Sequence, residues 1–288
     1  AEANIGGEDD DEHLKTIVTI SDGNTFTADS LTAEASATAS QQVEMKGISI
    51  SASPFGISGA AQVNTGGAAA YSDVVVTVGN NVFKGQETGI DLAIHGDNTV
   101  TQTANAQGVG VGTMFATGTN LAETKAQLST QVTAKGSADG SNVHDVDMKA
   151  SSYAKIDNDA SEYGGALVDV RPYAAKVENN YAADTDVVIG GTWNTADSFT
   201  AQALNGMDVD LKSDAVRAAI VGGSGTWLNN VINNAVNVTI DKAKITTDGA
   251  QSYIARNKDD YVGEIDGYGE GGANVNATDY ADNLEFTA

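Results

Sequence analysis

Apolar and polar residues alternate with a period of two along most of this chain. The alternation is strict at 46–51, 207–212 and 236–241. Because successive side chains of a β-strand point to opposite faces, the pattern predicts strands with one buried face. Turn signals recur between the strands: Asp22-Gly23, Gly66-Gly67, Gly96-Asp97-Asn98, Asp139-Gly140, Gly222-Gly223 and Asp248-Gly249. The sequence therefore predicts an all-β protein.

A degenerate repeat of about 55 residues underlies this pattern. β-Branched runs begin at residues 17, 75, 131, 187 and 237, at intervals of 58, 56, 56 and 50 residues. A repeat of this length without helical periodicity is typical of a solenoid. We expect the runs to stack on one side of a rod and to bury their apolar faces, Val188 included. The segment 213–234 has some helical composition, but its glycines favour strand–turn–strand.

A parallel β-helix is favoured over its alternative, the antiparallel β-sandwich of a filament subunit. Small residues alternate with polar ones at Ala33, Ala35, Ala37 and Ala39, which suits a narrow interior. Asn pairs at 179–180, 229–230 and 233–234 are suited to amide ladders along an axis. At ~20 residues and ~4.8 Å per coil, we expect ~14 coils and a rod ~65 Å long. We divide the chain into a polar acidic arm, 1–14, and a rod, 15–288.

Charge and composition restrict the partners. The chain carries 39 acidic and 15 basic residues, a formal net charge of −24, and it has no cysteine. Such a surface repels nucleic acid and anionic lipid, so neither is expected as a partner. No run of 18 apolar residues exists, so no membrane insertion is expected. Acidic, cysteine-free and Thr/Asn-rich composition predicts a secreted or surface protein of a bacterium.

Catalytic chemistry is sparse in the sequence. The three histidines, His13, His95 and His144, are scattered without the spacing of metal ligands. A β-helical enzyme acting on acidic polysaccharides needs basic residues in its groove, and only Arg171, Arg217 and Arg256 supplement the lysines. We therefore expect no enzyme activity and keep a polysaccharide-active β-helix enzyme as an alternative.

Calcium is the ligand that the acidic residues favour, although we expect no required cofactor. Asp157, Asn158 and Asp159 place side-chain oxygens close together, and Glu162 follows. The pattern begins like an EF-hand loop, but it lacks the glycine at the sixth position and flanking helices. The candidate metal ligands are thus Asp157, Asp159 and Glu162.

The segments 216–227, 236–240 and 244–249 resemble repeat units of very large bacterial adhesins of the leukotoxin-type filamentous adhesin family. These proteins are similar to filamentous haemagglutinins of two-partner secretion. The resemblance is best over residues 200–285. It implies a right-handed parallel β-helix that is exported and displayed on the cell surface or released.

Together these observations predict an extracellular structural and adhesive rod segment of a large surface adhesin, with roles in cell adhesion and virulence. Its expected partners are a receptor or glycan on a host or neighbouring cell, or copies of itself. One alternative is a filament subunit that polymerises by strand exchange, with 1–14 and 17–20 as the donor strand.

Overall fold

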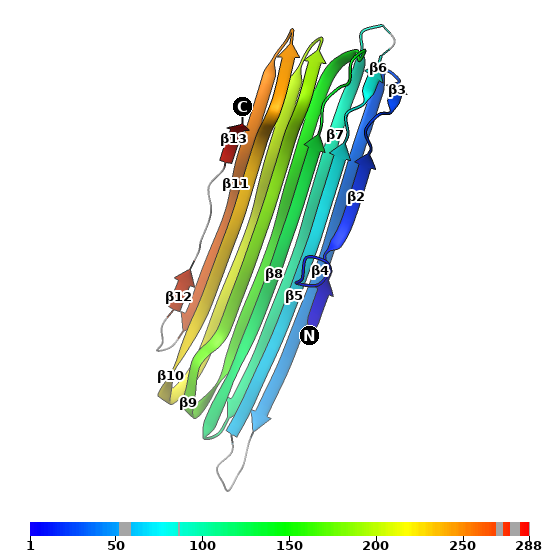
Figure 1. Ribbon diagram of the computed structural model, residues 1–288. Helices are drawn as coiled ribbons and strands as arrows, with labels where there is room; N and C mark the ends of the chain where they lie inside the picture. Colours follow the sequence, from blue (N-terminus) through cyan, green and yellow to red (C-terminus); the bar gives the residue numbers. More distant parts are fainter. Residues whose placement is uncertain (52–58, 86, 269–272, 277–282, 288) are drawn as a thin grey trace.

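The computed structural model describes residues 1–51, 59–85, 87–268, 273–276 and 283–287 (Figure 1). All regular structure in these residues is β-strand, which confirms the all-β prediction. The strands are β1 (Glu2–Ile5), β2 (Leu14–Ile20), β3 (Thr25–Thr27), β4 (Ser30–Ser51), β5 (Gly59–Val78), β6 (Val82–Lys84), β7 (Ile90–Gly112), β8 (Phe115–Ala134), β9 (Val143–Thr195), β10 (Phe199–Thr247), β11 (Gln251–Tyr268), β12 (Ala273–Asn276) and β13 (Asn283–Thr287). The described part of the chain contains no helix that could span a membrane.

The strands form successive coils that pair in parallel. β4 pairs with β7, and β7 pairs with the first half of β9. β5 pairs with β8, and β8 pairs with the second half of β9. β10 repeats this arrangement along the whole of β9. Every pairing between the named strands is parallel, so the chain winds as a parallel β-helix and not as an antiparallel sandwich.

One coil of the helix takes a whole repeat, which corrects the expected coil of ~20 residues. Each coil makes two long passes: β4 and β5, or β7 and β8, supply one pass each, whereas β9 and β10 each make both passes within one strand. Gly66-Gly67 and Gly96-Asp97, which the sequence marks as turns, lie inside β5 and β7. The 22 residues of β4 span about 70 Å at about 3.3 Å per residue. The long axis of the protein therefore runs along the strands, as Figure 1 shows, and the chain makes fewer coils than the sequence predicts.

The two passes of each coil face one another across a narrow interior. The amide nitrogen of Asn98 on β7 donates to the carbonyl of Ser72 on β5 at 2.8 Å. A Cβ added at Gly108 on β7 would lie 2.5 Å from the Asn120 side chain on β8. Glycine at this position thus makes room for a side chain from the facing strand. Ala33, Ala35, Ala37 and Ala39 all point inward, as the sequence predicts.

The interior contains an apolar end, a polar middle and stacked aromatic rings. At the end where the connections 79–81, 135–142 and 196–198 lie, Phe83 stacks on Phe26 with ring centroids 5.9 Å apart and on Trp193 at 6.5 Å. Phe199 then contacts Trp193 at 5.8 Å. Because these rings come from different coils, they tie successive coils together where the chain reverses.

The β-branched runs stack as predicted, with one shift in register. Val76, Val132, Val187 and Val238 occupy one inward column, and each is at most 1% exposed. Val188 pairs with Thr133 and points outward, so its predicted burial is wrong. Starting at Val18, successive residues of the column are 58, 56, 55 and 51 positions apart. The run that begins at 187 is therefore offset by one residue from the register that the sequence predicts. A slip of one residue moves every side chain to the opposite face.

The segment 213–234 is strand throughout and belongs to β10. Its pairing with β9 shifts register between Ser224 and Thr226, where the chain passes from one pass of the coil to the other. The prediction of strand over helix is therefore confirmed, but the predicted turn is replaced by a shift in register within one continuous strand.

Candidate functional site

Residues 6–13 form a loop that covers the outer face of the sheet beside β5. The loop joins β1 to β2, which both pair with β5. Lys125 on β8 contacts the loop through Glu8, with Nζ 2.6 Å from Oε1, and lies 5.4 Å from the centre of the Tyr71 ring. The hydrogen bond that Lys125 donates to Glu8 raises the pKa of Lys125. The segment predicted as an acidic arm thus lies against the rod in this structure.

His13 holds the end of this loop. Its Nδ1 lies 2.8 Å from Oδ1 of Asp73, and only 3% of its side chain is exposed. The ring packs 5.6 Å from the ring of Tyr71. Its Nε2 forms no hydrogen bond with any described residue and lies 3.8 Å from Oδ1 of Asp10. A neutral His13 that donates through Nδ1 would present Nε2 as an acceptor.

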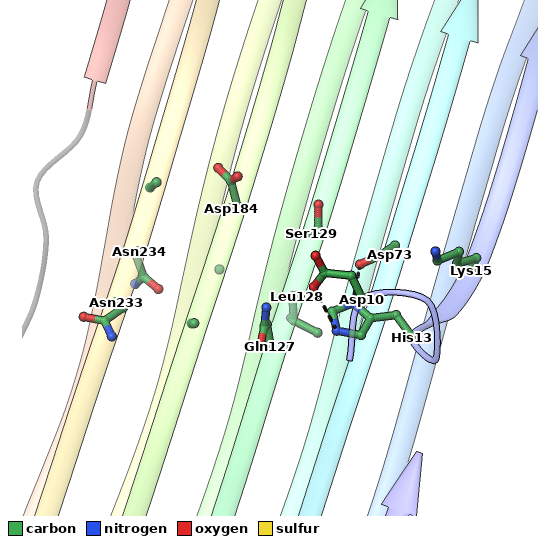
Figure 2. A pocket seen from close by; sticks show the side chains of 13 residues that line it. Asp10, His13, Lys15, Asp73, Gln127, Leu128, Ser129, Asp184, Asn233 and Asn234 are labelled. Carbon is green, nitrogen blue, oxygen red and sulfur yellow. Dashed lines mark hydrogen bonds and ion pairs between the residues drawn. The ribbon is translucent and has the colours of Figure 1, made fainter. Parts of the chain in front are cut away.

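A groove of about 780 Å³ extends from this histidine across the sheet (Figure 2). It is lined by Asp10, His13, Lys15, Asp73, Gln127, Leu128, Ser129, Ala182, Ala183, Asp184, Asn233, Asn234 and Ala235. These residues come from the loop, from β2 and β5, and from the coils of β8, β9 and β10. The lining combines apolar side chains with amides, a hydroxyl and carboxylates, so the groove offers a ligand both hydrogen-bond donors and acceptors.

Burial and the neighbouring Asp186 raise the pKa of Asp184 in this groove. Burial comes first among these causes. The carboxylate is held next to Ser129 and Ala235 by the parallel register of β8, β9 and β10. A ligand group that donates a hydrogen bond to Asp184 would relieve part of this cost.

A second cluster of polar groups lies at the turn end of the other sheet. Ile90 pairs with Val143 and Leu92 pairs with Val146, so a β-bulge sets Asp91 opposite both His144 and Asp145. Nδ1 of His144 lies 2.9 Å from Oδ1 of Asp91 and 3.1 Å from Oδ2 of Asp145.

The protonation of this cluster follows from its contacts. The hydrogen bond with Asp91 is the largest cause that raises the pKa of His144. For Asp145, burial acts to raise the pKa, but the bonds from Ser198 and the nearby His144 outweigh it and the pKa is lowered. The cluster is thus a histidine placed between two carboxylates.

The predicted calcium ligands are not brought together. Asp157 and Asp159 lie on the outer face of β9, whereas Glu162 is 1% exposed and points into the interior. There Asn120 donates a hydrogen bond to Glu162. Burial, followed by the charge of Asp157, raises the pKa of Asp159. The segment is a strand and not a turn, and alternation places Glu162 on the face opposite to Asp157 and Asp159.

Sequence reasoning missed both the groove and the cluster at the bulge. His13 and Asp73 are 60 residues apart, and His144 and Asp91 are 53 residues apart. Each separation is close to one repeat, so a correct register would have paired them. The remaining histidine, His95, lies 3.1 Å from a single carboxylate, Asp147.

Comparison with protein-family models, with curated proteins and with solved structures finds no match to this chain.

Proposed function

We propose that this chain is a structural and adhesive rod segment of an extracellular bacterial surface protein. In this proposal the chain binds a partner and serves as a spacer, and it does not catalyse a reaction. Its partner is a hydroxyl-rich glycan or a receptor on a host or neighbouring cell. The single observation that carries the proposal is the groove of about 780 Å³, whose hydrogen-bonding side chains come from successive coils of the β-helix.

The interior supports the groove from behind. Leu128 and Ala183, which line it, are also core residues that are 1% and 4% exposed. Adjacent side chains on the outer face are fixed at the spacing of neighbouring strands, about 4.8 Å. A repeating polymer can match such a regular row of hydrogen-bonding groups with little rearrangement of the protein, which lowers the entropic cost of binding.

The acidic surface favours a neutral glycan over a polyanionic one. The formal net charge is −24, and the lining includes Asp10, Asp73 and Asp184 beside one cation, Lys15. Neutral hydroxyl groups can donate to these carboxylates and accept from Gln127 and the Asn233 amide.

The test is binding of the full chain to an array of glycans and to intact cells. The double variant Gln127→Ala/Asn233→Ala removes two side chains from the groove. Thr133→Ala, which points outward from β8 outside the groove, is the matched control. We expect the double variant to lose binding at least tenfold and the control to retain it. Equal binding by all three proteins would refute the groove as the adhesive site.

The filament-subunit alternative predicts a different behaviour. The proposed donor is 1–14 with 17–20, and in this structure residues 2–5, 14 and 17–20 of it pair with β5 of the same chain. Strand exchange would require their release and pairing with another copy. Native mass spectrometry of the full chain distinguishes the proposals, because strand exchange gives a ladder of multiples of 29.4 kDa and a rod segment gives the single mass.

A further inference from the structure

The second cluster carries an inference that is independent of the proposed adhesive function. We propose that Asp91, His144 and Asp145 bind one transition-metal ion of the zinc class, which joins two successive coils at the turn end of the rod. Each residue offers one ligand atom, and these atoms lie within 4.8 Å of one another.

The β-bulge creates this convergence. In a regular strand, two consecutive residues point to opposite faces, so His144 and Asp145 could not both face the same neighbour. The bulge places Val143 and Val146 in the core and leaves His144 and Asp145 between them, both half-buried beside Asp91. The extra residue thus adds a ligand without disturbing the apolar column.

The distances fit a small ion. Nδ1 of His144 is 2.9 Å from Oδ1 of Asp91 and 3.1 Å from Oδ2 of Asp145. Tetrahedral zinc with bonds of about 2.0 to 2.1 Å separates its ligand atoms by about 3.3 Å. The side chains therefore need to open by a few tenths of an ångström to receive the ion, and Asp91 and His144 are exposed enough to do so.

A neighbouring residue orients one of the ligands. Oδ1 of Asp145 accepts hydrogen bonds from the backbone nitrogen of Ser198 at 2.8 Å and from its hydroxyl at 2.7 Å. These bonds leave Oδ2 directed at His144. A ligand carboxylate held in this way by groups outside the coordination sphere is a common feature of metal sites. Ser198 precedes β10, so the site is supported by a third coil.

The donor set selects the kind of ion. One imidazole nitrogen and two carboxylate oxygens suit zinc or cobalt, with water completing the coordination. Calcium requires six to eight oxygen ligands and does not favour an imidazole nitrogen. The bulge site is therefore distinct in chemistry from the calcium site that the sequence predicts at Asp157, Asp159 and Glu162.

The test uses the full chain, stripped with EDTA and dialysed. Zinc binding is measured by calorimetry, and Co²⁺ serves as an absorption probe of coordination. His144→Ala removes the nitrogen ligand. His95→Ala is the matched control, because His95 contacts a single carboxylate at 3.1 Å on the same sheet. We expect one zinc ion per wild-type chain, at least tenfold weaker binding in His144→Ala, and a change of less than twofold in His95→Ala.

Two further readouts sharpen the result. Ser198→Ala, which keeps all three ligands, should weaken zinc binding by about tenfold, as loss of such supporting bonds does elsewhere. Zinc should raise the melting temperature of the wild type but not of His144→Ala. Unchanged zinc affinity in His144→Ala, or calcium that displaces zinc at equal concentration, overturns the proposal. Many weak zinc ions per chain with no site affected by His144→Ala would show adsorption to the acidic surface and also overturn it.

Discussion

Asn179 donates a hydrogen bond from its side-chain nitrogen to the side-chain oxygen of Asn230 at 2.8 Å, across two successive coils in the interior of the protein. Thr124 donates to the oxygen of Asn179 at 3.0 Å, and Asn158 donates to Thr124 at 2.6 Å. Because Asn158 lies on the first pass of its coil and the others on the second, this network joins the facing sheets. A polar core of this kind fixes the register of the coils as well as their distance.

Replacing Asn179 with Ala tests the strength of this network. The change leaves the oxygen of Asn230 and the hydroxyl of Thr124 buried without their present partner. We expect a loss of about 1 to 3 kcal/mol in the free energy of unfolding, the typical cost of an unsatisfied buried polar group. Urea unfolding followed by Trp fluorescence measures it.

Asn180→Ala provides the control, because Asn180 lies on the same strand and is exposed on the outer face. We expect it to change stability by less than about 0.5 kcal/mol. Equal effects of the two substitutions would mean that the internal network contributes nothing beyond the loss of an amide.

Val187 and Val188 test which side chains of this strand point into the core. Val187 is fully buried in the apolar column, and Val188 points outward between Thr133 and Thr239. Val187→Asp should cost several kcal/mol or prevent folding, because it buries an unpaired charge. Val188→Asp should cost much less. The order of their melting temperatures checks the register, and the reverse order would contradict it.

These two residues also show how far the sequence predicts the fold. Alternation and the spacing of the β-branched runs were sufficient for a parallel β-helix with repeats of about 55 residues. They were not sufficient for the register, because the interval at Val187 changes from 56 to 55 residues and one residue reverses the facing. The coil is longer than the sequence predicts because Gly66 and Gly96, which resemble turn residues, occupy narrow positions inside strands.

The candidate sites were beyond sequence reasoning for the same reason. His13 meets Asp73, and His144 meets Asp91, only after one full coil. The cluster at His144 also depends on a β-bulge, which cannot be predicted from the alternation of apolar and polar residues. Asp157 and Glu162 are close in sequence and yet on opposite faces, because the segment is a strand and not the turn that its Asp and Asn residues predict.

Like charges on the outer face predict a response to salt. Asp157 on β9 pairs directly with Asp210 on β10, and like charges opposite one another destabilise a sheet. We expect the melting temperature to rise between 10 mM and 500 mM NaCl, because the Debye length falls from about 30 Å to a few ångströms. Asp157→Asn should raise the melting temperature at 10 mM NaCl, with a smaller effect at 500 mM.

Asp248→Asn, in an exposed turn, makes the same change in net charge and serves as the control. It should raise the melting temperature less than Asp157→Asn does. Since Glu162 points away from Asp157 and Asp159, calcium and magnesium at equal ionic strength should act alike on this face. A larger effect of calcium that Asp157→Asn abolishes would restore the predicted calcium site.

The raised pKa of Asp184 predicts how the stability of the protein depends on pH. Burial, followed by the charge of Asp186, raises its pKa in the folded protein above the usual value of 3.8. The folded state therefore binds this proton more tightly than the unfolded state does. The stability that the group contributes is present below pH 3.8 and is lost as the pH rises through the folded-state pKa.

Asp184→Asn, which mimics the protonated acid, should therefore stabilise the protein at pH 7. Its advantage should disappear below pH 3.8, where Asp184 is protonated in both states. Melting temperatures of the wild type and the variant from pH 3 to pH 8 measure this difference. Asp139→Asn, in an exposed turn, controls for the loss of one negative charge. If Asp184→Asn and Asp139→Asn shift the melting temperature equally at every pH, the effect is one of net charge, and the carboxylate in the groove carries no cost of burial.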